Sequence, residues 1–178
     1  MGGSSPCRPL ITSTNNPAAI SPLNKLSLRV NVSQSQFSTE PSSNIVDGSD
    51  SRWLVYRNKV YQPFVELFID RKRVLNRLRI TPLKNVGATS IASLVSIEFD
   101  DASATYLQFD CTSNTQTFYL EKPTARFKMT ILKTCDEVKN DYTGLTEVVA
   151  YEGGINSKLN IIQMHCSTNV DRYQYIST

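Results

Sequence analysis

The chain has 178 residues, of which 40% are hydrophobic and 20% are charged, an ordinary composition for a globular protein with room for one substantial core. The net charge is +3, and basic residues are scattered among acidic ones, so nucleic acid is not an expected partner. No apolar run approaches the roughly 18 residues that a membrane helix requires, so we expect no transmembrane segment.

Residues 1–22 are rich in Ser, Thr, Asn and Pro, and we interpret them as a flexible N-terminal tail without the features of a signal peptide. Apolar residues then alternate from Leu26 to Val32, which predicts an edge strand entering a domain. The sequon Asn31-Val32-Ser33 in this stretch is a weak indication of an extracellular address.

From Trp53 onward the apolar pattern has a period of two. One face of 64–70 and one face of 74–80 are apolar around the basic segment 71–73, which predicts a hairpin. A second hairpin is predicted from 95–99 and 107–111, joined by the turn 100–103. Further strands are expected at 118–120, 127–131 and 145–151, and no window has a helical period.

Repeated short strands with one apolar face each predict an antiparallel β-sandwich, in which each sheet covers one face of the other. The residues expected in its core are Trp53, Leu67, Ile69, Leu78, Ile80, Ile97, Phe109, Phe127, Ile131 and Val149.

Four cysteines, Cys7, Cys111, Cys135 and Cys166, lie far apart and form no CxxC pair, so a thiolate zinc site is not expected. In a secreted protein they would form two disulfides, in one of three connectivities, whereas in the cytosol they would be reduced thiols. Composition leaves both states open.

The order of these patterns resembles the discoidin, or coagulation-factor C-type (galactose-binding-like), domain family over about residues 24 to 153. The resemblance is carried by Asp47-Gly48 ahead of Trp53, by PFVELFIDRKRVLNRLRI at 63–80, and by RFKMTIL and GLTEVVAYEG at 126–132 and 144–153. It implies an all-β jelly-roll sandwich at 23–153, after the tail at 1–22. Residues 154–178 form a C-terminal extension, either an extra strand or the beginning of another segment.

The chain departs from many secreted members of that family, because it has no cysteine at residues 24–44. Intracellular relatives use the same sandwich to dock other proteins. Two locations therefore stay open, an extracellular or cell-surface one and an intracellular one.

Glu147 alternates with Leu145, Val149 and Tyr151 and is therefore predicted to face the interior, where a carboxylate needs a partner. Many carbohydrate-binding relatives hold a structural calcium ion between the Asp-Gly loop and an acid on the closing strand. The resemblance places these metal ligands at Asp47, Asp50, Ser51 and Glu147, and oxygen ligands suit Ca²⁺. The alternative is a salt bridge from Glu147 to Arg52 or to another cation at the buried edge, with Asp47 acting only as a turn residue.

Ligands of this fold class usually meet loops at one end of the sandwich. Here the loop LVYRNKVYQP at 54–63 supplies two aromatic rings and three hydrogen-bond donors, which suit a sugar or an anionic headgroup. The predicted ligand-binding residues are Tyr56, Arg57, Lys59 and Tyr61. In the alternative interpretation the tyrosines pack beneath the loop and the cations remain solvated.

Catalysis has little support in the sequence. His165 and Cys166 are neighbours, and neighbours on a strand point to opposite faces. Asp100 and Asp101 sit in a turn, where adjacent acids usually cap the local backbone. We therefore expect a non-catalytic module that binds a carbohydrate, a glycoconjugate or another cell-surface ligand. The alternative is an intracellular scaffold domain that binds a protein partner.

Overall fold

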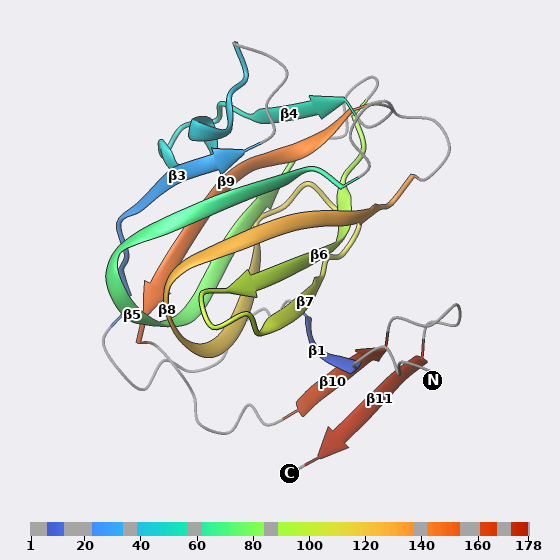
Figure 1. Cartoon of the computed structure of the whole chain (residues 1–178). Coiled ribbons are helices and arrows are strands. Elements are labelled where there is room, and N and C mark those ends of the chain that lie inside the picture. The colour runs from blue at the N-terminus through green and yellow to red at the C-terminus, as the bar shows by residue number, and fades with distance from the viewer. Residues whose placement is uncertain are drawn as a thin grey trace, which may run out of the picture.

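The computed structural model describes residues 7–12, 23–33, 39–56, 62–83, 89–136 and 142–153, and the backbone of residues 161–166 and 172–177. In this part of the chain nearly all regular structure is β (Figure 1). The elements are β1 (Cys7–Thr12), β2 (Asn24–Lys25), β3 (Leu28–Ser33), the 3-10 helix η1 (Ser42–Val46), β4 (Trp53–Tyr56), β5 (Phe64–Pro82), β6 (Ala92–Phe99), β7 (Ala104–Gln108), β8 (Gln116–Thr134), β9 (Tyr142–Glu152), β10 (Ile161–Cys166) and β11 (Arg172–Ser177).

Two long bent strands, β5 and β8, build the sandwich. The first part of β5 pairs with β3 and with the second part of β8, whereas its last part pairs with β9 and with the first part of β8. Figure 1 shows β5 running to one end of the molecule and turning back there. The continuous strand order β11-β10-β1-β7-β6-β8-β5-β9-β2, with β3 on β5 and β4 on β9, therefore folds over into two layers.

The hairpin predicted for residues 64–80 is wrong. These residues form the single strand β5, and both of its parts pair with β8 rather than with each other. The register shifts between Phe68 and Arg73, and again between Leu75 and Arg77. Alternation within each part is the same for a hairpin as for a bent strand, so the sequence pattern does not separate the two arrangements.

The core lies between the two layers and contains the fully buried side chains of Trp53, Phe118 and Phe127. Every residue expected in the core is buried except Val149. On β9 the register shifts because Thr81 pairs with Glu147 whereas Pro82 pairs with Leu145. This leaves one extra residue in β9, as in a β-bulge.

The shift on β9 reverses the faces of the residues that follow it. Val148 and Ala150 are buried, whereas Glu147, Val149 and Tyr151 are only partly covered. The prediction that Glu147 points into the core is therefore wrong, because a one-residue slip moves every later side chain to the opposite face.

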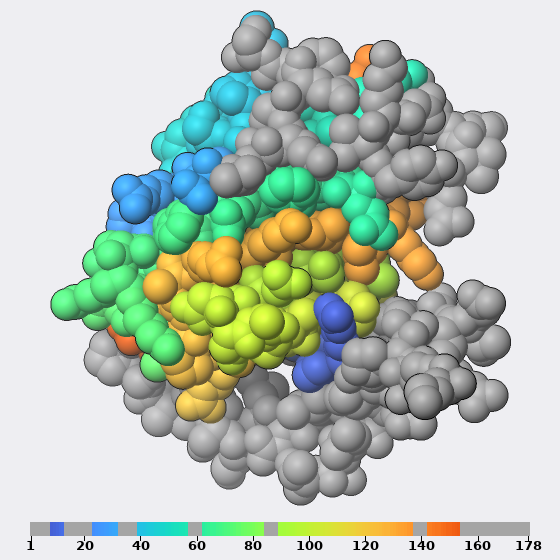
Figure 2. Space-filling model, in the orientation of Figure 1, coloured from blue at the N-terminus to red at the C-terminus, as the bar shows by residue number. Residues whose placement is uncertain are grey.

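Strand β1 lies within the segment that the sequence suggested is a flexible tail. It pairs in parallel with β7, and Leu10, which is 2% exposed, packs with Leu94 and Tyr106 in a small cluster separate from the main core. Figure 2 shows β1, in dark blue, at the surface of the sandwich beside the yellow-green residues. A short Pro-Leu-Ile run has no period of its own, so only its distant partners reveal the strand. The extension after residue 153 contains β10 and β11, and β10 pairs with β1.

The segment 100–103 forms the expected turn between β6 and β7, whose residues pair in antiparallel register. The amide of Phe99 donates to the carbonyl of Ser103 at 2.9 Å. Among the described residues, no helix is long and apolar enough to cross a membrane.

Candidate functional site

Strand ends from distant parts of the sequence meet at one end of the sandwich, called here the loop end. The last residue of β4, Tyr56, pairs with the first residue of β9, Tyr142, and Thr89 forms a bridge to Tyr142. Ser33 of β3 pairs with Val65, near the start of β5. The loop end therefore gathers the last residues of β3, β4, β5 and β8 and the first residues of β9.

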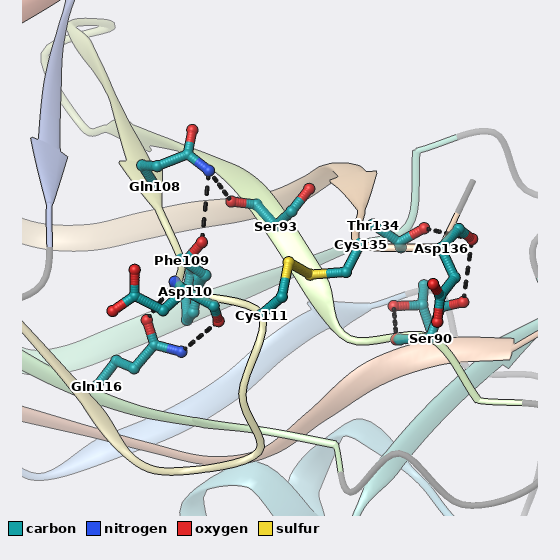
Figure 3. The surroundings of a disulfide bond; sticks show 11 residues. Ser90, Ser93, Gln108, Phe109, Asp110, Cys111, Gln116, Thr134, Cys135 and Asp136 are labelled. Carbon is teal, nitrogen blue, oxygen red and sulfur yellow. Dashed lines mark hydrogen bonds between the residues drawn. A yellow bond between two sulfur atoms is a disulfide. The ribbon is translucent and has the colours of Figure 1, made fainter.

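A disulfide between Cys111 and Cys135, with an S–S distance of 2.04 Å, ties the loop after β7 to the end of β8 (Figure 3). This bond settles the pairing of two of the four cysteines. The amide of Asp110 donates to Oε1 of Gln116 at 2.8 Å, and Nε2 of Gln116 donates back to the carbonyl of Asp110 at 2.8 Å. Nε2 of Gln108 donates to the carbonyl of Ser93 at 3.0 Å. The loop 109–116 is thus held covalently and by hydrogen bonds on both sides.

A second group of hydrogen bonds joins the start of β9 to the segment before β6. The amide of buried Ser90 donates to the carbonyl of Tyr142 at 2.8 Å, and Oγ1 of buried Thr143 donates to the carbonyl of Ser90 at 3.1 Å. Oγ of Ser90 donates to the carbonyl of Asp136 at 3.3 Å. Buried polar groups that are all paired in this way make a rigid support.

Of the predicted ligand-binding residues, only Tyr56 lies in the described part of the chain. Its ring is half-buried and packs on Tyr142, with centroids 5.3 Å apart and planes inclined by 51°. Arg57, Lys59 and Tyr61 lie outside the described residues. The sequence reasoning did not select Tyr142. Its only signal in the sequence is that it is aromatic and stands just before the predicted closing strand.

Glu147 does meet the Asp-Gly loop, as the calcium hypothesis requires. A pocket of about 220 Å³ is lined by Lys25, Leu26, Ser27, Leu28, Val46, Gly48, Glu147, Val148 and Val149. Gly48 has a φ of +74°, which a glycine adopts without strain. The bulge on β9 therefore leaves Glu147 in the lining of this pocket rather than in the core.

The alternative salt bridge between Glu147 and Arg52 is absent. Nε of Arg52 lies 2.6 Å from Oε1 of Glu40 instead, and the carbonyl of Arg52 accepts a hydrogen bond from Asn44 at 2.8 Å. Among the residues with described side chains, Glu147 has no ion-pair partner. Glu147 is half-buried and shares the pocket lining with Lys25.

The other three predicted ligands, Asp47, Asp50 and Ser51, are not part of the pocket lining. Asp47, Asp50 and Ser51 are exposed, and Oδ1 of Asp47 accepts a hydrogen bond from the amide of Ser49 at 2.8 Å. Asp47 therefore also acts as a turn residue. In the described part of the chain no three His, Cys, Asp or Glu side chains gather as a metal cluster, so a calcium ion here would depend on Glu147 and on backbone oxygens.

Two carboxyl groups with clearly shifted pKa values lie on other parts of the surface. Burial raises the pKa of Glu66, but hydrogen bonds from Arg126 and Asn31 and the charges of Arg126 and Lys128 together lower it below its ordinary value of 4.5. Hydrogen bonds from Lys122 and Ser103 hold the pKa of Asp101 far below its usual range. Both carboxyl groups are therefore ionised at neutral pH.

Asp101 caps the backbone of its own turn, as the sequence suggested, whereas Asp100 binds a backbone amide of the distant strand β8. Oδ1 of Asp101 accepts hydrogen bonds from the amide and hydroxyl of Ser103 at 2.9 and 2.6 Å, and Oδ2 of Asp100 accepts one from the amide of Ala125 at 2.8 Å. Neither carboxylate is arranged for acid-base chemistry. His165 lies in β10, opposite Arg8 and Tyr173 in register.

Comparison with solved structures shows the fold. A family 32 carbohydrate-binding module of Clostridium perfringens NanJ, in complex with galactose, matches with a TM-score of 0.60 and 13% identity over 73% of this chain and 99% of that one. A module of C. perfringens CpGH89, in complex with GalNAc-β-1,3-galactose, matches with a TM-score of 0.58 and 11% identity over 73% of this chain and 100% of that one.

An F5/8 type C domain from Bacteroides fragilis matches with a TM-score of 0.58 and 15% identity over 75% of this chain and 98% of that one. No protein-family model and no curated protein matches the sequence. The predicted discoidin-like sandwich is therefore confirmed as a fold.

Proposed function

We propose that the chain is a non-catalytic carbohydrate-binding module that holds a glycan at its loop end. The observation that carries this proposal is the rigid loop end itself, where a disulfide and hydrogen bonds hold the loop after β7 to β8, and the segment before β6 to the start of β9. Rigid scaffolds with converging loops are the usual location of binding sites. The similar modules that hold galactose and GalNAc-β-1,3-galactose support a galactose-type ligand.

The direct contacts in this proposal come from the segment after β4. Tyr56, anchored against Tyr142, presents an aromatic surface for the apolar face of a sugar ring, while Arg57 and Lys59 donate hydrogen bonds to its hydroxyls. Tyr61 supplies a second ring. Because Tyr56 is already held against Tyr142, its side chain loses little conformational entropy when a ligand binds, and this favours affinity.

We further propose that a structural calcium ion occupies the pocket beside Gly48, with Glu147 as its carboxylate ligand. The support is that Glu147 lines this pocket without an ion pair, since Arg52 is bound to Glu40. Calcium accepts carboxylate and backbone carbonyl oxygens in flexible geometry. The ion would tie the Asp-Gly loop to β9 and take no part in chemistry.

An extracellular location agrees with the Cys111–Cys135 disulfide, because disulfides persist in oxidising compartments. The exposed side chain of Asn31 is compatible with the sequon in which it stands. Free thiols at Cys111 and Cys135 in the native protein, together with a stable protein complex, would favour the intracellular docking function instead.

A glycan array followed by calorimetry with galactose and N-acetylgalactosamine tests the function. Tyr56→Ala and Arg57→Ala should each weaken the best neutral ligand by about 1 to 2 kcal/mol. Arg71→Ala is the matched control, because Arg71 is an exposed arginine at the bend of β5, away from the loop end. Equal affinities for all three variants would contradict the proposed site, and an empty array would contradict carbohydrate binding.

A further inference from the structure

A row of cationic and aromatic side chains crosses the outer surface of the layer formed by β8, β5 and β9. Arg77 stands in the middle strand, in register with Tyr119 on one side and Tyr151 on the other. Arg79 follows in the next row, between Thr117 and Val149. The four residues Arg77, Arg79, Tyr119 and Tyr151 are called here the arginine face.

The guanidinium of Arg77 lies between the two tyrosine rings, 5.9 Å from the centroid of Tyr119 and 5.1 Å from that of Tyr151. Cation–π contacts of this length are attractive and hold the planar group in a fixed place. The Nε atom of Arg77 is buried and has no hydrogen-bond partner. The fold therefore holds this guanidinium in place and leaves its Nε atom unpaired.

The arginine face also lacks a neutralising carboxylate. Arg52, Arg73 and Arg126 each have an acidic partner, namely Glu40, Glu152 and Glu66. Within the described residues neither Arg77 nor Arg79 has one, and Arg79 is exposed. Two carboxylates lie outside the centre of the face. Glu147 is opposite Thr81 in the following row, and the exposed Glu121 is two residues beyond Tyr119 on β8.

The geometry of a strand sets the spacing of the two cations. Residues two apart on one face of a strand are separated by about 7 Å, so Arg77 and Arg79 present two guanidinium groups in line along β5. Each guanidinium can bind a carboxylate with two parallel hydrogen bonds. The flanking tyrosines add aromatic surface that sugar rings can contact. The surface of a sheet suits an extended polysaccharide chain better than a single terminal sugar.

We propose that the arginine face is a second binding site, which takes a carboxylate-bearing polysaccharide, a polyuronate, along the outer surface of β5. The two arginines bind carboxylates of the chain, and Tyr119 and Tyr151 contact its rings. This site is separate from the loop end and does not rest on the function proposed there.

Calorimetry with sodium alginate as the polyuronate tests the proposal on the full chain. Arg77→Gln and Arg79→Gln should each weaken binding about tenfold, the effect of about 1.4 kcal/mol in binding free energy. Arg71→Gln removes the same charge at the exposed bend of β5 and should change the affinity less than about twofold. Because Arg79 is exposed, its variant should fold normally even if Arg77→Gln lowers the melting temperature.

Three results would overturn the proposal. The first is no detectable alginate binding at millimolar concentration, and the second is an equal loss in the Arg71 variant. The third is binding of polyglutamate or duplex DNA with the same dependence on Arg77 and Arg79, because that would show attraction to any polyanion. Tyr56→Ala should leave alginate affinity unchanged, so failure at the arginine face and failure at the loop end are distinguishable.

Discussion

Removing the disulfide at the loop end should cost a large share of the stability of this protein. The change is the double substitution Cys111→Ser and Cys135→Ser, which opens a loop with a sequence separation of 24. The loop-entropy relation for a closed loop of this length gives a loss of about 3.4 kcal/mol at 25 °C, mainly because the unfolded chain becomes freer. The hydrogen bonds between Asp110 and Gln116 should keep the native loop in place.

Urea unfolding followed by fluorescence of Trp53 measures this loss, because Trp53 is completely buried. At a slope of about 1 to 3 kcal/mol per molar urea, the midpoint should fall by about 1 M or more. A loss below about 1 kcal/mol would refute the reasoning and show that native strain offsets the cross-link. Reductant added to the double variant then reports on Cys7 and Cys166, whose backbones are opposite each other in β1 and β10.

The remaining predictions concern packing, metal and pH. Gly144→Ala should destabilise the fold by about 1 to 3 kcal/mol in urea melts, because a Cβ there would lie 1.9 Å from the carbonyl oxygen of Trp53; an unchanged midpoint would contradict the close approach of β4 and β9. Phe127→Ala, at a fully buried position, should cost about 3 to 5 kcal/mol in the same assay, and a melt like that of the wild type would contradict the strand register. Calcium should raise the melting temperature relative to chelator, and Glu147→Gln should abolish this difference; identical melts of the wild type in both conditions would remove the calcium proposal. Because the pKa of Glu66 is lowered in the folded state, its ionisation stabilises the fold at neutral pH and the contribution disappears as the pH falls below 4.5. Glu66→Gln should therefore be less stable than the wild type at pH 7 and approach it in acid melts, whereas a constant gap from pH 7 to pH 3 would contradict the shifted pKa.

Local alternation of apolar residues was enough to predict an all-β sandwich, and nine of the ten core residues named from it are buried. Leu67 and Ile69 are buried, as are Ile97, Phe127 and Ile131, because the period of two is a property of any strand with one covered face. The turn at Asp101 was equally predictable from the sequence, because its side chain caps the amide of Ser103 within the same turn. Such features depend only on neighbours in the sequence.

What the sequence pattern left undecided depends on partners far away along the chain. The bend of β5, the strand at Cys7–Thr12 and the bulge on β9 exist because other strands pair with these segments. The bulge decides which way Glu147 faces, and the pairing of β5 with both β8 and β9 places Arg77 between two tyrosines. Alternation specifies which residues share a face, but only the tertiary structure decides what that face meets.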